Sequence, residues 1–396
     1  MTWSACRTNT AAARSALWRA GGGKAAPLDS KVARNVDWTL VSLAVALGLF
    51  GLLAVYEATD AWSAVRQQAL WLVVGLGVMA FVAWMDYHFW ARWAKLIYVA
   101  DILLLAGTLV IGHRVLGAQR WIGFGPFHVQ PSELAKVAMI VTLAAVVAPR
   151  FGRLTRLRDA IVPTLLVVPP AFLVIKQPDL GTSIAFVAIL TGVLFMGGLS
   201  GWKIAAVAIV ATACAVGLIY AHYRYHVPVP LASYQLQRLV VFTNPQSDPL
   251  GSGFHILQSE IAIGSGQLFG KGVVVTPANA LTYLPEASND FIFAVVAQRL
   301  GFIGAGALLL GLVLLLARGM WVASKARDAF GACLAAGVVA MLAFHTFINA
   351  GMTMGMMPVT GVPLPFTSAG GSALLADYVG IGLLLSVHMR RKKIQF

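Results

Sequence analysis

The chain has 396 residues, of which 59% are hydrophobic and only 11% are charged, and its mean hydropathy is +0.79. This composition excludes a soluble globular protein. Lys and Arg outnumber Asp and Glu by 29 to 15, a net charge of +14. We interpret this excess as a sign of membrane topology, so no nucleic-acid partner is expected.

The chain begins with residues 1–36, which combine Ala and Gly tracts with basic residues and lack the apolar core of a signal peptide. We interpret them as a flexible basic cytoplasmic tail. Apolar segments then follow, each close to the length of about 20 residues that crosses a bilayer. The ten predicted spans are residues 37–56, 67–85, 95–112, 131–149, 160–176, 182–199, 202–222, 289–316, 330–349 and 373–389. The sequence therefore predicts an all-α, polytopic membrane protein with a ten-span domain over 37–389 and a basic cytoplasmic C-terminus at 390–396.

The basic residues predict the orientation of these spans. If the N-terminus is cytoplasmic, most of the 29 Lys and Arg fall in cytoplasmic segments, as the positive-inside rule requires. The three long connections, residues 113–130, 223–288 and 350–372, then lie together on the outer side. Irregular backbone at membrane depth is tolerated where it lines a wet cavity. These connections therefore predict the walls of an outward-facing cavity.

Asp290 is the leading candidate for chemistry, in the segment LPEASNDFIFA (284–294). An ionisable group at a membrane boundary is costly unless it is used or paired. Ser288 or Asn289 is a good N-cap and would place Asp290 in the first turn of the eighth span. The helix dipole there favours the carboxylate and burial favours the acid, so this group can accept a proton near neutral pH.

If the helix begins earlier, Glu286 shares the same face as Asp290. The two carboxylates would then either hold a divalent cation or raise the pKa of one of the pair. An ordinary helix-terminal acid is the plainer alternative.

A second candidate is QPSELAK (130–136), where Pro131 suits the first helical position and Glu133 complements the positive helix end. Lys136 lies one turn further into the span. It either pairs with Glu133 or faces the cavity and binds an anion. Arg120, just upstream in GAQRWI, would add a second cation, and the two together would suit a phosphate or pyrophosphate.

Two other segments are less specific. In QPDLGTS (177–183), Asp179 either caps a helix or lines the cavity. Residues 234–272 are typical of an amphipathic external helix pair interrupted by glycines. The three Cys have no nearby partners, so neither a disulfide nor a thiolate metal site is predicted. No convincing internal repeat is present, which counts against an inverted-repeat transporter.

Taken together, six motifs resemble those of the SEDS family, the shape, elongation, division and sporulation proteins of bacteria, and they run in the family's order. They are GAQRWI (117–122), QPSELAK (130–136), QPDLGTS (177–183), NPQSDPLGSGFHILQSEIAIGSG (244–266), LPEASNDFIFA (284–294) and NAGMTMGMMPVTGVPLPFTSAGGS (349–372). Within the family, the sequence DPLGSGFHI resembles the RodA branch more than the FtsW branch, in which Gln is usual at the position of His255.

This resemblance implies a peptidoglycan glycosyltransferase that polymerises lipid II at the outer face of the bacterial inner membrane during cell elongation and rod-shape maintenance. It implies a class B penicillin-binding protein and other elongation-machinery membrane proteins as partners. The family's essential aspartate falls on Asp290, the expected general base. A divalent cation, Mg²⁺ or Mn²⁺, held by Asp290 and Glu286 is one option for stabilising the leaving pyrophosphate. The expected substrate-binding residues are Arg120, Lys136, Glu133, Gln130, Asp179, Gln258, Ser259, Glu286 and Ser368.

One departure from the family pattern concerns the eighth span. Family members usually read EELG where this chain reads QRLG (298–301). Arg299 would lie about 13 Å along the helix from Asp290, where a cation needs a partner, and Asp101 and Asp377 are the candidates. This departure favours a non-catalytic activator of the penicillin-binding protein as an alternative function. A lipid II flippase, with Asp290 as a coupling acid, is the other alternative.

Overall fold

The computed structural model describes residues 35–115, 118–124, 127–225, 233–248, 251–272 and 287–391. The predicted cytoplasmic tail and Glu286 therefore fall outside the described residues, apart from the last two residues of the tail. Within the described part, the apolar segments form helices, because a helix satisfies every backbone hydrogen bond without help from the solvent.

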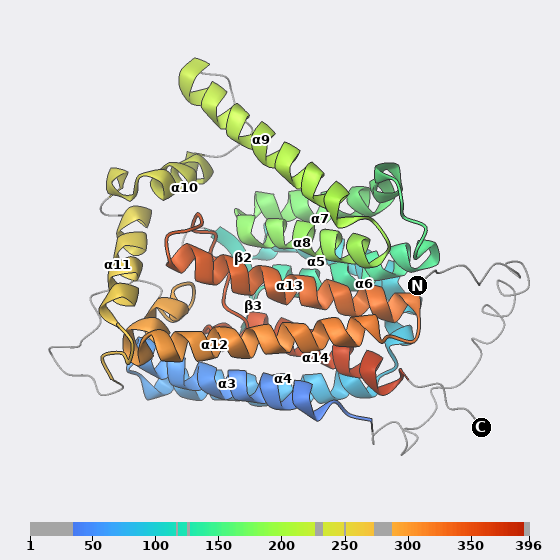
Figure 1. Cartoon of the computed structure of the whole chain (residues 1–396), viewed down its shortest axis with the longest axis horizontal. Coiled ribbons are helices and arrows are strands. Elements are labelled where there is room, and N and C mark those ends of the chain that lie inside the picture. The colour runs from blue at the N-terminus through green and yellow to red at the C-terminus, as the bar shows by residue number, and fades with distance from the viewer. Residues whose placement is uncertain are drawn as a thin grey trace, which may run out of the picture.

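Each of the ten predicted spans is a helix, and the helices form one bundle (Figure 1). They are α3 (Trp38–Thr59), α4 (Trp62–Trp84), α5 (Tyr87–Ile111), α6 (Pro131–Val147), α7 (Ile161–Lys176), α8 (Leu180–Met196), α9 (Gly201–Tyr225), α12 (Ile292–Ser324), α13 (Ala329–Thr353) and α14 (Gly371–Met389). Nine helices of the described chain are long and apolar enough to cross a membrane, where α6 is counted to Arg150 and α7 from Leu157 because each continues into a 3-10 turn. The exception, α8, has 17 residues and spans about 25 Å, slightly less than the hydrocarbon core of about 30 Å.

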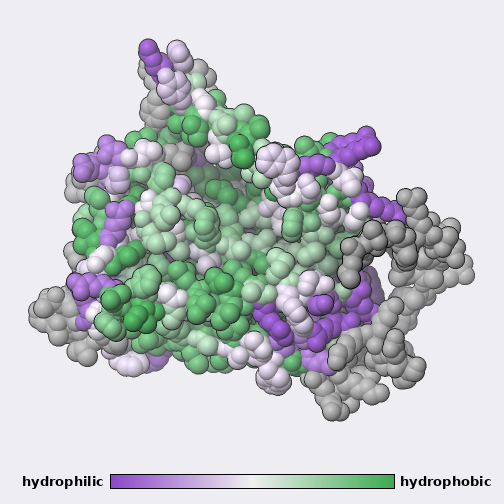
Figure 2. Space-filling model, viewed as in Figure 1, coloured by the Kyte–Doolittle hydropathy of each residue, from purple (hydrophilic) through white to green (hydrophobic). Residues whose placement is uncertain are grey.

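The molecular surface agrees with a membrane protein whose helices run along its long axis. Figure 2 shows a hydrophobic band across the middle of the molecule, with hydrophilic residues gathered towards both ends. Large apolar side chains along the helices are exposed, among them Leu103, Val110 and Ile209. Such side chains suit contact with lipid rather than with water. The chain is therefore a multi-pass membrane protein.

Helices α6, α13 and α14 form the interior of the bundle. Helix α13 packs on α8 and α12, α14 packs on α4, and α6 packs on α5, α8 and α13. Helix α9 differs from the rest, because almost its whole length is exposed and it projects obliquely from the bundle (Figure 1). Four polar side chains of the site, Glu133, Lys136, His345 and Asn349, are carried by two of these enclosed helices, α6 and α13, where packing determines their positions.

One end of the bundle, called the site end below, carries the longer connections. Residues 113–130, predicted only as an irregular connection, contain three short antiparallel strands, β1 (His113–Val115), β2 (Ala118–Phe124) and β3 (Phe127–Val129). In the pairing, His113 is opposite Trp121 and Ile122 is opposite Val129. The predicted helix pair is confirmed as α10 (Ser233–Thr243) and α11 (Ser252–Ser265). The short 3-10 helices are η2 (Ala148–Arg150), η3 (Leu157–Ala160) and η4 (Pro245–Ser247).

Helix α12 begins later than the sequence indicates, and the predicted N-cap at Ser288 or Asn289 is wrong. Its N-cap is Phe291, without a side-chain cap, and residues 287–291 form a turn that precedes the helix. The backbone of this turn is bonded to other segments, since Ala369 N donates to the Ser288 carbonyl at 2.8 Å. Asp290 therefore lies in a turn held by tertiary contacts and not in the first turn of the helix.

Helix α12 is also interrupted near its start, at Gly301, whose φ is 68° and ψ is −168°. The interruption leaves the backbone carbonyls of Gln298 and Arg299 free to accept hydrogen bonds from outside the helix. They accept from the Lys271 and Gly272 amides at 3.0 and 3.1 Å, respectively. A turn that follows α11 is thus bonded into the break. The backbone polar groups that the kink releases are satisfied by this turn, as a low-dielectric setting requires.

The partner of Arg299 is Glu57 of α3, so the predicted candidates Asp101 and Asp377 are both wrong. Arg299 Nε lies 3.4 Å from Glu57 Oε2, and both side chains are almost fully buried. The pairing connects two helices that are far apart in the sequence, α3 and α12, which pack along each other. Sequence spacing within the later spans could not identify a partner on the first span.

Candidate active site

The turn that carries Asp290 is held by one buried amide. Asn349 of α13 donates from Nδ2 to the Asp290 carbonyl at 2.9 Å and to the Val362 carbonyl at 2.8 Å. Asn349 is fully buried, so its position is well defined. Asp290 itself is half-buried, and its Oδ2 would lie 3.3 Å from a Cβ atom placed on Gly361. The turn before α12 and the connection between α13 and α14 therefore meet at the Asp290 carboxylate.

The ammonium of Lys136, on α6, contacts α13 one helical turn before Asn349. Lys136 Nζ is 2.8 Å from Glu133 Oε2 and 3.0 Å from Nε2 of His345, and all three side chains are buried. The predicted pairing of Lys136 with Glu133 is thus present. His345 precedes Asn349 by four residues, which is a rise of about 6 Å along one face of the helix. One face of α13 therefore connects the predicted cation with the turn of the predicted base.

Arg120 binds backbone at the turn between α7 and α8. Its Nε donates to the Gln177 carbonyl at 2.7 Å, and its Nη2 donates to the Pro178 carbonyl. These bonds use two of the five guanidinium donors. Arg120 thus fastens β2 to the segment that begins α8, and these two hydrogen bonds go to backbone carbonyls rather than to Lys136 or Asp290.

Asp179 is the N-cap of α8, one of the two alternatives that its motif left open. Its Oδ1 accepts from the Thr182 amide at 3.1 Å, and its Oδ2 accepts from Gln130 Nε2 at 3.0 Å and from the Ser132 hydroxyl at 3.2 Å. Three of the sequence motifs, those around Arg120, Gln130 and Asp179, therefore converge where α6 and α8 begin. Their side chains mainly bond one another, so any effect of Asp179 on substrate passes through this network.

The other predicted substrate-binding residues lie around the same end. The Ser368 hydroxyl accepts from the Leu364 amide at 2.8 Å. Ser259 of α11 is buried and donates to the Thr353 carbonyl at 2.7 Å. Gln258, its neighbour, is half-buried. These contacts fasten α11 to the end of α13 and fix the connection between α13 and α14. The substrate-binding role of each residue stays a prediction.

The predicted metal pair cannot be located, because Glu286 falls outside the described residues. Among the described residues, no group of three His, Cys, Asp or Glu side chains is arranged to hold a metal ion. Asp290 and a polyanionic substrate would together offer oxygen ligands of the kind that Mg²⁺ prefers. The role of a divalent cation therefore stays a prediction.

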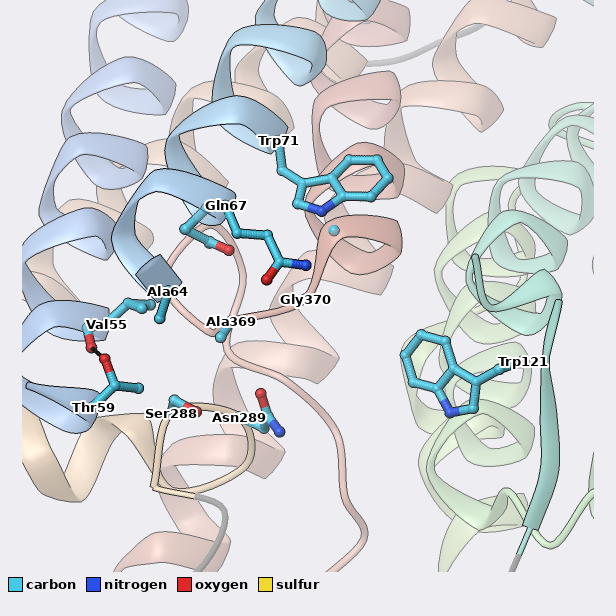
Figure 3. A pocket seen from close by; sticks show the side chains of 12 residues that line it. Val55, Thr59, Ala64, Gln67, Trp71, Trp121, Ser288, Asn289, Ala369 and Gly370 are labelled. Carbon is cyan, nitrogen blue, oxygen red and sulfur yellow. Dashed lines mark hydrogen bonds between the residues drawn. The ribbon is translucent and has the colours of Figure 1, made fainter. Parts of the chain in front are cut away.

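A pocket of about 260 Å³ opens beside the Asp290 turn (Figure 3). It is lined by α3 and α4, by Trp121 of β2, by Ser288 and Asn289, and by residues 369–371 at the start of α14. Figure 3 shows Trp71 and Trp121 on different sides of this pocket, with Gln67 beside Trp71 and Asn289 beside Ser288. The two residues that precede Asp290 thus line a cavity large enough for a small organic group.

Sequence reasoning did not single out Asn349 or His345, and it did not predict that the residues of this pocket line one cavity. A signal was present for the first two, since polar side chains are costly and uncommon inside membrane spans. Asn349 and His345 are four residues apart in the apolar sequence of α13, which places them on one face. Six of the twelve lining residues, Trp121, Ser288, Asn289 and 369–371, lie inside the quoted motifs. Their common cavity could not be foreseen, because its walls come from four separate parts of the chain.

The chain is similar to known proteins in sequence and in overall fold. A sequence model of the FtsW, RodA and SpoVE family, described as "Cell cycle protein", matches residues 34–393. The chain is 37% identical over 361 residues to the peptidoglycan glycosyltransferase MrdB of Escherichia coli strain K12, covering 91% of this chain and 95% of that protein.

Two solved structures are similar over nearly their full length. One is described as "Structural coordination of polymerization and crosslinking by a peptidoglycan synthase complex"; it is 31% identical, with a TM-score of 0.76, and the match covers 90% of this chain and 98% of that chain. The other is the crystal structure of the rod shape determining protein RodA of Thermus thermophilus, 30% identical, with a TM-score of 0.67 and the same coverage. With its sequence motifs, ten helices and converging polar residues, the chain belongs to the FtsW, RodA and SpoVE family, the SEDS family.

Proposed function

We propose that this peptidoglycan glycosyltransferase polymerises lipid II into glycan strands, with Asp290 as the general base. The observation that carries the proposal is the placement of Asp290. Its turn borders a pocket, and the buried Asn349 ties the same turn to the helix face that also binds Lys136. A carboxylate in a turn that borders a cavity, linked through one helix to a buried cation, fits a reaction that removes a proton and expels an anion.

The proposed reaction joins two lipid-linked saccharides. The 4-hydroxyl oxygen of the acceptor sugar forms a bond to the anomeric carbon of the donor, and the bond from that carbon to the pyrophosphate oxygen breaks. The electron pair leaves with the lipid pyrophosphate, and the hydroxyl proton goes to the Asp290 carboxylate. A sugar hydroxyl is a poor nucleophile, so a base within about 3 Å of its proton is needed. Direct attack inverts the configuration at the donor carbon.

Lys136 and Arg120 support the departure of the pyrophosphate in this proposal. Charge accumulates on the leaving group, and cations that are already in place stabilise it without reorganisation. Lys136 is held by Glu133 and His345, so its ammonium is oriented before substrate binds. The two backbone hydrogen bonds of Arg120 use only two of the five N–H donors of its guanidinium group. Arg120 contributes either directly or by fixing the α7–α8 turn.

The proposal extends to orientation and partners. The site end faces outward, both termini face the cytoplasm, and the lipid tails of the substrates stay in the bilayer. The positive-inside rule supports this orientation. A class B penicillin-binding protein, which crosslinks glycan strands, is the proposed partner, because a similar solved chain belongs to a complex described as coordinating polymerization and crosslinking. The proposed role in cell elongation rests on the sequence around His255, DPLGSGFHI, which is closer to the RodA branch of the family.

The test compares the three functions that the sequence left open. Purified protein in liposomes, alone and with its penicillin-binding partner, is given lipid II, and both glycan polymer and translocated lipid II are measured. The proposal expects polymer in the presence of the partner. Translocation without polymer would instead identify a flippase. Polymer made only by the partner's own catalysis, unaffected by changes at Asp290, would identify a non-catalytic activator.

A further inference from the structure

We propose that the pocket between Trp71 and Trp121 binds the terminal N-acetylated sugar of the acceptor, the one whose hydroxyl is deprotonated. This inference rests on the proposed function and specifies which part of the substrate the pocket takes. The pocket has a volume of about 260 Å³, and none of the twelve described residues that line it is charged. A pyrophosphate requires cations in its binding site, so the pocket does not suit that group.

The chemistry of the lining instead suits an uncharged saccharide. Two indoles lie on different walls, and aromatic faces attract the weakly positive C–H groups of an apolar ring face (Figure 3). The same pocket is lined by the side-chain amides of Gln67, Gln68 and Asn289, which donate and accept hydrogen bonds. Amides of this kind match the hydroxyl and acetamido groups of an N-acetylated sugar.

The wall formed by α4 is held in place by other parts of the fold. Trp71 is 7% exposed and packs against the start of α14, where a Cβ atom on Gly371 would come within 2.1 Å of Trp71 Cε2. Gln68, one turn earlier on the same face, donates from Nε2 to the Ser368 carbonyl at 3.1 Å. The indole and this amide are therefore preorganised, which lowers the entropic cost of binding a ligand.

The location of the pocket favours the acceptor rather than the donor. Ser288 and Asn289 line it and immediately precede Asp290, the proposed base. The reacting hydroxyl belongs to the acceptor's outermost sugar, which a second sugar separates from the acceptor's own pyrophosphate. An uncharged pocket next to the base therefore fits that outermost ring. The donor's reacting carbon, in contrast, carries the pyrophosphate directly and belongs near the cations.

The test measures binding of a neutral probe, methyl β-N-acetylglucosaminide, to the full chain in detergent micelles by saturation-transfer NMR. Wild-type protein is expected to transfer saturation to the ring protons and the acetyl methyl group. Trp121→Ala is expected to weaken binding about tenfold, which corresponds to losing about 1.4 kcal/mol of stacking and contact energy. Methyl β-glucoside, which lacks the acetamido group, is expected to bind more weakly, and inorganic pyrophosphate is expected not to compete.

Two variants serve as controls. Trp202→Ala removes an indole on α9 that is 76% exposed and does not line the pocket, so probe binding should be unchanged. Gln67→Ala changes an exposed residue of α4, so folding should persist, and it should weaken probe binding if Trp121→Ala fails to fold. Unchanged binding in both Trp121→Ala and Gln67→Ala, or equal loss in Trp202→Ala, would overturn the assignment.

The binding test separates this inference from the proposed catalytic role. Asp290→Asn is expected to keep probe binding while losing polymerisation. Trp121→Ala is expected to raise the KM for lipid II about tenfold with a smaller effect on kcat. If Asp290→Asn polymerises normally and Trp121→Ala still loses the probe, the base assignment fails and the sugar pocket stands. If the probe binds all variants equally, the pocket assignment fails whatever happens to polymerisation.

Discussion

At the scale of single residues, the site depends on polar side chains that are buried in pairs. Lys136 is matched by Glu133 and His345, and Arg299 is matched by Glu57. Burying an unpaired charge costs several kcal/mol, whereas a pair is tolerated. The sequence predicted the first pair because its members are three residues apart. It could not predict the second, because Glu57 and Arg299 meet only after α3 and α12 pack together.

The Glu57–Arg299 pair predicts a measurable stability effect. Arg299→Met would leave the Glu57 carboxylate buried without the guanidinium and should lower the free energy of unfolding by about 3–5 kcal/mol. Glu57→Met together with Arg299→Met should recover most of the loss, because two apolar side chains replace the pair. Thermal unfolding in detergent micelles measures both. An Arg299→Met protein as stable as wild type would show that the pair is unimportant.

At the scale of elements, α12 shows the limits of local sequence patterns. The ten spans could be predicted because apolar length is a local property. The start of α12 could not, because Asn349 and the α13–α14 connection bond the turn at Asp290 and replace the expected cap. The strands within 113–130 were also missed. They are short, and their pairing depends on how the chain turns back on itself rather than on alternation within one run.

The break in α12 predicts a contrast between two glycines of the same helix. Gly301 adopts φ 68° and ψ −168°, a conformation that is almost restricted to glycine, and a Cβ atom there would meet Gly270 N. Gly301→Ala should therefore destabilise the protein by about 1–3 kcal/mol. Gly306→Ala is the matched control, since nothing lies within 4 Å of its Cβ position and Ala favours the helix.

The measurement for this pair is the midpoint of thermal unfolding, read for both variants in the same micelles. Gly301→Ala should unfold at a lower temperature than wild type, and Gly306→Ala at an equal or higher temperature. Equal destabilisation of the two variants would mean that the break at Gly301 has no special backbone requirement. Because the turn after α11 bonds into the break, Gly301→Ala should also increase proteolysis between α11 and α12.

At the scale of the whole molecule, the end opposite the site is also held by polar contacts between helices. Asp328, the N-cap of α13, accepts from the Tyr87 hydroxyl at 2.7 Å and from His88 Nε2 at 2.8 Å, which joins α13 to α5. The Gly331 amide, in the first turn of α13, also donates to the Asp328 carboxylate at 2.7 Å. This cluster connects distant segments at the end where the loops are shortest.

The cluster predicts a pH dependence of stability. Burial acts to raise the pKa of Asp328, but hydrogen bonds from His88, the Gly331 amide and Tyr87 outweigh it and lower the pKa to about 2. Because the folded pKa lies below the ordinary value near 3.9, this stabilisation is complete above about pH 4 and is lost as the pH falls towards 2. Asp328→Asn should flatten the decline of the unfolding midpoint over that range. An unchanged slope would contradict the role of this carboxylate.

The amount of glycan polymer that Asp290→Asn makes from lipid II, with the penicillin-binding partner present, tests the central claim most directly. Asn keeps the size of the side chain but cannot accept the proton, so polymer should fall at least a hundredfold, the contribution expected of a general base. Asp60→Asn, which alters an exposed acid between α3 and α4 at the same end, should polymerise at the wild-type rate. Normal polymerisation by a folded Asp290→Asn protein would contradict the assignment of Asp290 as the base.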